Sequence, residues 1–360
     1  MRLWYKYMFL AGLLLGLFSA LIRTNNFFKY RINSSPHLIH FIYGYDSLCK
    51  LCLCVFESAL FYSSANLMIW AKDIEQLKSD LKDNRLWFPY RMEVREYNVK
   101  SIFAGTPLEG FEVSELFNRT TMPNYMMVDA ARLAIVWKYG GAYSDCDLLH
   151  IADWDSSSEP FSFMIQDRFS VSAGKIVNDQ SGQVVQGFDW QMLNNAFFVL
   201  PKGSKIGWEL MRRFIAENEP DYHRKWGFNG PGLFTRVAHD CFYRLGAFAS
   251  PSLLLDECDQ LKLMPWKTVT PMRYDQVENG QYWKPVNESS SQILYQSLKQ
   301  WHSVLLEIKL PWKDEGDGDR FHSKKSRAPD STVSRYSLLA SLLREHCPIS
   351  TQGVLINSLT

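Results

Sequence analysis

The sequence lacks an excess of charge of either sign. Its 360 residues include 39 Lys and Arg against 38 Asp and Glu, which gives a net charge of +1 at pH 7. Proteins that bind nucleic acid normally carry a strong basic field, and this balance excludes one for the chain as a whole. We therefore expect no nucleic acid among its partners.

The chain also lacks the second ligand pair that a structural zinc site needs. Cys49, Cys52 and Cys54 are closely spaced, but no further Cys or His pair at ligand spacing follows them. Disulfide bonds formed in an oxidising compartment are therefore the favoured interpretation. Because the seven cysteines are an odd number, at least one thiol stays unpaired, and Cys146 is our candidate.

The N-terminal apolar run is short. The uncharged residues 8–22 span about 22 Å as a helix, against roughly 30 Å for a typical bilayer core. A cleaved signal peptide is one interpretation, but cleavage after Ala20 would place Phe18 where a small residue is preferred. We favour a short cytoplasmic tail and signal-anchor helix at 1–23, followed by a stem at 24–36. Its shortness suits the thinner membranes of the early secretory pathway.

Three Asn-x-Ser/Thr sequons agree with a body inside the secretory pathway. They lie at Asn33, Asn118 and Asn287, and each becomes a glycosylation acceptor where its segment is translocated. Chance supplies one or two sequons in a chain of this length, so they only support a glycoprotein.

From residue 37 onward, strand-like and helix-like stretches alternate. We expect strands at 37–45, 66–71, 91–99 and 192–200, helices at 51–65, 73–82, 205–217 and 233–243, and a long loop at 170–186. This alternation predicts an α/β fold with a doubly wound, mostly parallel sheet and flanking helices. Ligands of such sheets bind beyond the carboxyl ends of the strands.

Two carboxylates stand out after the apolar helical run 130–139. The run ends at Gly140 and Gly141, and a short strand-like stretch then leads to Asp145 and Asp147. On a strand, side chains two residues apart share a face, with Cβ atoms roughly 6–7 Å apart. Carboxylate oxygens suit Mg²⁺ or Mn²⁺ together with substrate phosphates. Asp-x-Asp alone is usually a solvated loop, but the glycine pair permits close backbone approach and favours a metal–nucleotide site.

Two further features flank this acidic pair. Asp129 and Arg132, three residues apart on the predicted helix, share one helix face. They form either a surface ion pair, worth a few tenths of a kcal/mol, or a second group of side chains directed to the site of Asp145. The turn at 226–232, Trp-Gly-Phe-Asn-Gly-Pro-Gly, exposes backbone amides that suit a hydroxyl or phosphate, or it is simply a helix start.

Several blocks of this sequence resemble one known family. They are residues 54–59 (CVFESA), 128–147 (VDAARLA to SDCD), 194–197 (NNAF), 226–237 (WGFNGPGLFTRV, similar to a Gb3-synthase-type block), 264–266 (MPW) and 346–348 (HCP). Their types and order resemble the α1,4-galactosyl- and α1,4-N-acetylglucosaminyltransferases, which are DxD glycosyltransferases.

The resemblance implies a type II Golgi membrane enzyme of GT-A fold that retains anomeric configuration and uses Mn²⁺ with a UDP-sugar. It implies a luminal glycosyltransferase domain at 37–350. Within it, 37–165 would form the nucleotide-binding half with the DxD pair, and 190–350 the acceptor-side, Gb3-synthase-like half.

Site residues follow from the same resemblance by position. It implies that Asp147 binds the metal, Asp145 the ribose and metal-bound water, Asp129 and Arg132 the sugar hydroxyls, with Tyr143 beside the nucleotide and Asn229 and Gly230 near the transfer site.

The sequence departs from the family pattern at three places. The segment 174–186 is longer than usual, and Asn195 replaces a glycine. The late His-x-Trp-Asn-Lys motif is absent, and residues 304–320 look inserted between His302 and His322. His322 is then the substitute metal ligand.

We therefore expect an Mn²⁺-dependent retaining glycosyltransferase that moves galactose or N-acetylgalactosamine from a UDP-sugar in α1,4 linkage onto a glycosphingolipid acceptor. The family is also compatible with homo-oligomers or hetero-oligomers with other glycosyltransferases. One alternative is an inactive sugar-nucleotide-binding protein or glycosyltransferase partner, because the C-terminal motif is disrupted. Another is a secreted glycoprotein without enzymatic activity.

Overall fold

The computed structural model describes residues 38–44, 49–121, 123–152, 162–170, 177–178, 183–184, 191–218, 227–243, 257–258, 260–264, 305–307, 342 and 345–349. The predicted anchor and stem at 1–36 lie outside these ranges. Within them, no helix is both long enough and apolar enough to cross a membrane.

A seven-stranded mixed sheet forms the centre of the described fold. Its order is β10 (Lys262–Met264), β6 (Ser162–Ser170), β9 (Gln191–Leu200), β4 (Gly141–Ser144), β1 (Leu38–Tyr43), β2 (Asn66–Ala71) and β3 (Met92–Glu96). The pairs β1–β2, β2–β3, β1–β4 and β10–β6 are parallel, whereas β9 runs antiparallel to both β4 and β6. The prediction of a mostly parallel sheet is confirmed.

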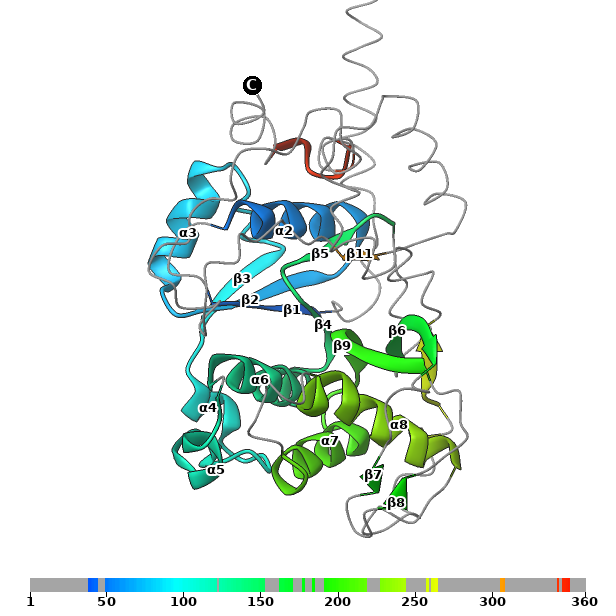
Figure 1. Ribbon diagram of the computed structural model, residues 1–360. Coiled ribbons are helices and arrows are strands. Elements are labelled where there is room, and N and C mark those ends of the chain that lie inside the picture. The colour runs from blue at the N-terminus through cyan, green and yellow to red at the C-terminus, as the bar shows by residue number, and fades with distance from the viewer. Residues whose placement is uncertain are drawn as a thin grey trace, which may run out of the picture. The chain divides into compact units, whose positions relative to one another are not determined.

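Helices cover both faces of this sheet (Figure 1). On one face lie α2 (Lys50–Tyr62) and α3 (Ile74–Asp83); on the other lie α6 (Pro123–Tyr139), α7 (Lys205–Ala216) and α8 (Leu233–Tyr243). Side chains of β1 alternate between the two apolar cores, with Ile39 and Phe41 in one and Ile42 in the other, because strand residues alternate faces. The sheet is therefore doubly wound, as predicted.

Smaller elements complete the described chain: α4 (Val99–Phe103), η1 (Phe111–Val113), α5 (Glu115–Asn118), β5 (Leu148–His150) paired with β11 (Leu305–Glu307), and β7 (Val177–Asn178) paired with β8 (Gln183–Val184). The prediction of a loop at 170–186 is wrong at 177–178 and 183–184, because β7 and β8 form an antiparallel pair there. The strand β6 was not predicted, because its sequence, SFMIQDRFS, is too polar to stand out as a buried strand.

A tight junction joins α6 to β4. Gly140 and Gly141 have φ angles of +73° and +99°, which L side chains rarely adopt. A Cβ on Gly141 would collide with the carbonyl oxygen of Leu38. The glycine pair therefore permits the close backbone approach predicted from the sequence.

A buried histidine fixes the same junction. Nε2 of His40 donates to the carbonyl oxygen of Gly140 at 2.9 Å, and Nδ1 accepts from Nε1 of Trp70 at 3.4 Å. Burial lowers the pKa of His40 from 6.5 to about 4. The ring is consequently neutral at pH 7 and holds the start of β4 by a hydrogen bond.

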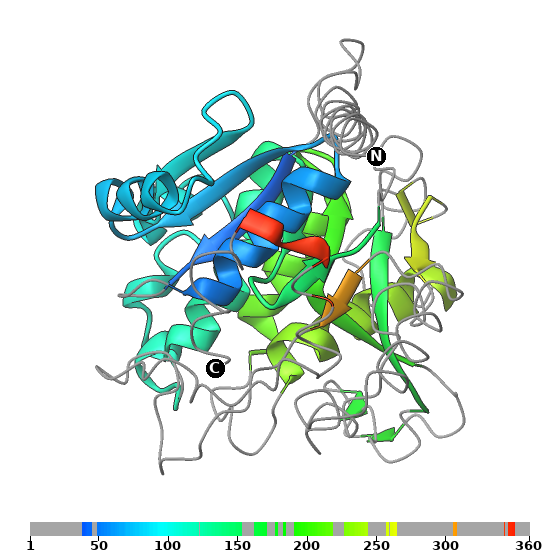
Figure 2. The same ribbon diagram turned by 90° about the horizontal axis from the view of Figure 1, so that it is seen from above.

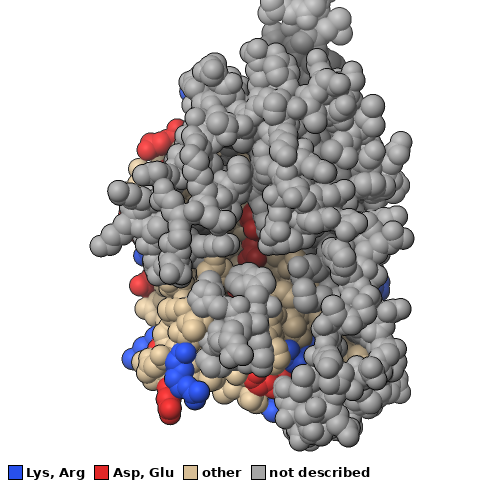
Figure 3. Space-filling model, in the orientation of Figure 1, with Lys and Arg blue, Asp and Glu red and all other residues tan. Residues whose placement is uncertain are grey.

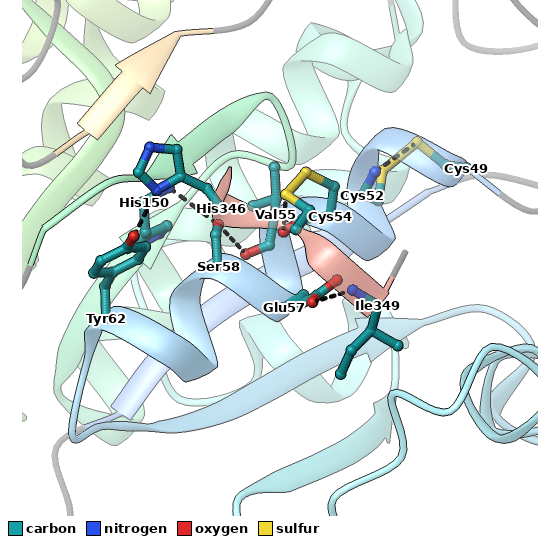
Figure 4. Close-up of a disulfide and its surroundings, with 11 residues drawn as sticks. Cys49, Cys52, Cys54, Val55, Glu57, Ser58, Tyr62, His150, His346 and Ile349 are labelled. Carbon is teal, nitrogen blue, oxygen red and sulfur yellow. Dashed lines mark hydrogen bonds between the residues drawn. A yellow bond between two sulfur atoms is a disulfide. The ribbon is translucent and has the colours of Figure 1, made fainter. Parts of the chain in front are cut away.

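The C-terminal residues are bound to α2. A disulfide joins Cys54 on the helix to Cys347, 293 residues later. Beside it, Oε1 of Glu57 accepts from the backbone nitrogen of Ile349 at 2.7 Å (Figure 4). Seen from above, residues 345–349 lie across α2 (Figure 2). We call this contact the C-terminal clamp.

The remaining cysteines agree with the expectation of disulfides. Cys49 pairs with Cys52, and Cys241 pairs with Cys258. Cys146 is free and buried, which confirms it as the unpaired thiol.

Candidate active site

The acidic pair lies on the turn between β4 and β5. The backbone nitrogen of Asp145 donates to the carbonyl oxygen of Ala196 on β9 at 2.8 Å. The backbone carbonyl oxygen of Asp145 accepts from the nitrogen of Leu148 at 3.2 Å, which closes the turn. The prediction that one strand carries both carboxylates is wrong, because β4 ends at Ser144. Asp145 and Asp147 are nevertheless both partly exposed and two residues apart.

Cys146 separates the two carboxylates and is directed into the core. Its Sγ donates to the carbonyl oxygen of Ile42 at 3.6 Å, and burial, followed by the charges of Asp145 and Asp147, raises the pKa of its thiol well above the ordinary value. The thiol is therefore neutral and holds the turn to the end of β1.

Arg132 connects helix α6 to this turn. Its Nη2 lies 3.3 Å from Oδ1 of Asp129, and its Nη1 lies 3.4 Å from Oδ2 of Asp145. The Arg132 side chain is only 8% exposed, and those of Asp129 and Asp145 are 15% and 27% exposed. The interpretation of Asp129 and Arg132 as a surface ion pair is thereby wrong. They belong to one cluster with Asp145.

Exposed charges elsewhere on the described surface behave differently. Lys, Arg, Asp and Glu residues are interspersed along the lower edge of the face in Figure 3. Pairs such as Lys78 with Glu75 are open to solvent and contribute little to stability. The pair of Arg132 and Asp129 is largely buried. Loss of either partner would leave the other charge desolvated and unpaired, which would lower the free energy of unfolding much more.

Tyr143 contacts both Asp145 and the guanidinium of Arg132. Its hydroxyl donates to Oδ1 of Asp145 at 2.6 Å, and the Cζ of Arg132 lies 4.7 Å from the centre of its ring. Burial raises the pKa of Tyr143 well above its ordinary value. The hydroxyl thus stays protonated and remains a donor to the carboxylate at any physiological pH.

Strand β9 and the turn after residue 226 form another wall of the cluster. Nη1 of Arg132 donates to the backbone oxygen of Asn195 at 2.8 Å, and Nδ2 of Asn195 donates to Oδ1 of Asp129 at 2.8 Å. The π-helical turn η3 (Phe228–Gly232) follows Gly227, which has a φ of +80°. A Cβ on Gly230 would lie 2.6 Å from Nδ2 of Asn195, so Gly230 packs directly against that amide.

A hydroxyl ties η3 to β9. Oγ1 of Thr235 on α8 accepts from the backbone nitrogen of Leu193 at 2.9 Å and donates to the carbonyl oxygen of Pro231 at 2.8 Å. Asn229 is buried within η3. The position of this turn relative to Asn195 is therefore fixed by hydrogen bonds.

The donor set fits a divalent cation that carries a diphosphate. Such an ion is usually held by one or two carboxylates together with phosphate oxygens, and Asp145 and Asp147 supply two partly exposed carboxylates on one turn. Within the described ranges no group of three His, Cys, Asp or Glu side chains could hold a metal by itself. His322, the other predicted ligand, lies outside the described residues.

The structure brings together most of the residues predicted for the site. Asp129, Arg132, Tyr143 and Asp145 form one bonded cluster, Asp147 lies on its turn, and Gly230 touches it through Asn195. The sequence did not assign a site role to Asn195 or to His40. For His40 the available signal was a polar residue within an otherwise apolar strand, and for Asn195 it was the replacement of a glycine noted in the sequence.

Comparison with known proteins gives two regions of family similarity. Residues 52–159 match the glycosyltransferase sugar-binding region containing the DXD motif, and residues 199–354 match the alpha 1,4-glycosyltransferase conserved region. Human alpha-1,4-N-acetylglucosaminyltransferase is 29% identical over 157 residues, which is 43% of this chain and 35% of the relative. Rat (Rattus norvegicus) lactosylceramide 4-alpha-galactosyltransferase is 23% identical over 272 residues, 74% of this chain and 59% of the relative. The matches thus span about one third and three fifths of these relatives.

Two solved structures also align with the chain. The PaToxG glycosyltransferase aligns over 68% of this chain and 82% of its own, with 15% identity and a TM-score of 0.41. The WbbM bifunctional glycosyltransferase aligns over 91% of this chain and 52% of its own, with 10% identity and a TM-score of 0.46.

These matches define a class: residues 52–159 carry the sugar-binding region of glycosyltransferases that contain the DXD motif. Within that class, residues 199–354 carry the alpha 1,4-glycosyltransferase conserved region, so the chain is similar to that family. This confirms the resemblance drawn from the sequence.

Proposed function

We propose that this chain is a UDP-sugar-dependent retaining glycosyltransferase of GT-A type, which moves galactose or N-acetylgalactosamine in α1,4 linkage onto a glycosphingolipid. The observation that carries this proposal is the arrangement around Arg132. The guanidinium of Arg132 lies between the carboxylates of Asp129 and Asp145. A further carboxylate, Asp147, lies on the same turn as Asp145. The cluster lies where β4 ends, and ligands of α/β sheets bind beyond the carboxyl ends of strands.

The residues suit distinct parts of a UDP-sugar. Asp147 would hold Mn²⁺, and Asp145, fixed by Tyr143 and Arg132, would accept from the ribose or from water on the ion. When bound, the cation would neutralise charge that develops on the leaving diphosphate. Asp129 and Arg132 would bind hydroxyls of the donor sugar.

The acceptor side is assigned to the second half of the chain. Asn229 and Gly230 on η3 are held next to Asn195 and the carboxylate of Asp129, so an acceptor hydroxyl near this turn would lie beside the donor sugar. We place the enzyme in the Golgi membrane as a single-pass type II protein with a luminal catalytic domain. The apolar residues 8–22 and the three disulfides support this location, because disulfides persist in oxidising compartments.

Transfer assays with the full chain test the proposal. The chain is incubated with Mn²⁺, one of UDP-galactose, UDP-N-acetylgalactosamine or UDP-N-acetylglucosamine, and a panel of glycolipids that includes lactosylceramide. We expect a product with a new α1,4 linkage and dependence on the metal. Binding of UDP-sugars in calorimetry without transfer to any acceptor would support the inactive sugar-nucleotide-binding protein instead. Absence of both binding and transfer would refute both functions.

A further inference from the structure

The side chain of Asn195 is fixed between two elements of the site. Its Nδ2 donates to Oδ1 of Asp129 on α6 at 2.8 Å, and on its other side it packs against the bare Cα of Gly230, where an added Cβ would lie only 2.6 Å from the same nitrogen. The residue is 7% exposed. Its amide therefore fills the space between helix α6 and turn η3.

The backbone of Asn195 is held as firmly as its side chain. Its carbonyl oxygen accepts from Nη1 of Arg132 at 2.8 Å, and the next residue, Ala196, accepts from the nitrogen of Asp145. Rotation of the amide out of this space would break its hydrogen bond to Asp129 and leave a carboxylate oxygen with one donor fewer, which is costly for a largely buried group. The amide thus acts as a rigid part of the wall rather than as a movable side chain.

We propose that Asn195 limits the size of the donor sugar, so that the site takes a hexose with a hydroxyl at C2 and rejects an N-acetylhexosamine. This inference rests on the proposed function and narrows its choice of donor. The proposed function gives Asp129 the hydroxyls of the donor sugar, and we take the C2 hydroxyl to be one of them. An acetamido group at C2 would add a carbonyl and a methyl group beside Asp129, where the Asn195 amide already lies. A sugar hydroxyl needs no such space.

The same contact predicts how a smaller residue would act. Replacement of Asn195 by glycine removes the amide and opens the gap between Asp129 and Gly230. It also removes a donor to Oδ1 of Asp129, although Nη2 of Arg132 stays close to that oxygen. We therefore expect weaker binding of the hexose and stronger binding of the N-acetylhexosamine in this variant.

Calorimetric titration of the full chain with Mn²⁺ present tests this proposal. UDP-galactose and UDP-N-acetylgalactosamine are titrated into the parent protein, Asn195→Gly and Asn195→Ala. The parent should bind UDP-galactose at least about tenfold more tightly, and Asn195→Gly should bring the two dissociation constants within about threefold, since steric discrimination in a site is worth roughly 10- to 200-fold. Asn195→Ala, which retains a Cβ, should fall between them and serves if the glycine variant unfolds.

Val199→Ala provides the matched control. It shortens a side chain of the same strand that is buried in the apolar core on the α2 side of the sheet, and its sugar preference should equal that of the parent. Equal binding of both UDP-sugars by the parent, or an unchanged preference in Asn195→Gly, would overturn this inference while leaving the proposed function intact. Failure of every UDP-sugar to bind the parent would overturn both.

Discussion

Arg132 and Asp145 form an ion pair between a helix and the turn that follows strand β4, with Nη1 and Oδ2 3.4 Å apart. The same guanidinium lies 3.3 Å from Asp129 and stacks over Tyr143. One cation therefore compensates two carboxylates and orders the aromatic ring that supports one of them.

Removal of the shared cation should destabilise the protein. Arg132→Ala leaves Asp129 and Asp145 without their common partner, and we expect the free energy of unfolding to fall by about 3 kcal/mol. Arg132→Lys should recover only part of it, since an ammonium cannot bridge two carboxylates as a planar fork does. Urea unfolding measures both. Lys82→Ala, at an exposed position on α3, should change the free energy by less than about 0.5 kcal/mol, and an equal loss in both alanine variants would contradict the prediction.

Asp147→Ala should abolish metal-dependent transfer. Loss of a group that stabilises developing charge typically costs about 10²- to 10³-fold in turnover, and loss of the ion's ligand should cost at least that much. The readout is product formation with UDP-galactose at increasing Mn²⁺ concentrations. Asp83→Ala, which removes an exposed carboxylate on α3, serves as the control. Unchanged turnover in Asp147→Ala would show that the acidic pair does not carry the metal.

Mild acid should weaken the fold through His40. Its pKa in the folded protein is about 4, against an ordinary 6.5, so between these values the unfolded chain binds a proton that the folded chain does not. The contribution of neutral His40 to the free energy of unfolding is therefore fully present above pH 6.5. It is lost as the pH falls towards 4, which lowers the free energy of unfolding by roughly 3 kcal/mol in total. His40→Gln retains a donor for Gly140 and should flatten this part of the profile of melting temperature against pH.

The profile of the His40→Gln variant should not become entirely flat. Burial lowers the pKa of His150 to about 3, so this second histidine contributes a loss of the same sign in the same pH range. A variant profile that matches the parent between pH 6.5 and 4 would contradict the role given to His40.

Gly141→Ala should be more harmful than a comparable change at another glycine. Gly141 and Gly105 both have positive φ, at +99° and +73°, but only a Cβ on Gly141 would meet backbone, the Leu38 carbonyl. Gly105→Ala should cost about 1–3 kcal/mol from its backbone conformation alone. Gly141→Ala should exceed that value and also disturb β4, which thermal unfolding and circular dichroism would reveal. Equal losses would show that β1 moves aside without cost.

The disulfides should differ in their contribution to stability. The Cys54–Cys347 bond closes a loop of 293 residues and Cys241–Cys258 one of 17. The chain-entropy description then makes the first bond about 2–3 kcal/mol more stabilising. The double variants Cys54→Ser/Cys347→Ser and Cys241→Ser/Cys258→Ser, compared in denaturant, measure this difference. The reverse order would contradict the expectation that the longer loop makes the Cys54–Cys347 bond the more stabilising one.

Local patterns predicted the parts of the fold that local sequence determines. Strand β2 was predicted with its observed bounds, and the Asp129–Arg132 pair followed from helical spacing, because both depend on residues near each other in the chain. The role of Asn195 and the pairing of Cys54 with Cys347 did not follow. Each depends on a partner far away in sequence, which periodicity does not encode. The prediction of strand through Asp147 was wrong because β4 ends at Ser144, although the nitrogen of Asp145 continues its hydrogen bonding to β9 for one more position.

The C-terminal clamp makes synthesis order matter for this protein. Helix α2 is among the first elements to emerge from the ribosome, yet the Cys54–Cys347 disulfide and the hydrogen bonds of Glu57 and Tyr62 to Ile349 and His346 form only when residues 346–349 have been made. Until then the nascent chain carries the Cys54 thiol without its disulfide partner, on a helix that packs against β5 through the Ser58 hydroxyl and the nitrogen of His150. A premature stop codon shortly before Cys347 would therefore leave that thiol without its partner permanently. Although every residue of the acidic cluster would be retained, the truncated chain would lack the disulfide and the hydrogen bonds that hold its C-terminal residues to α2.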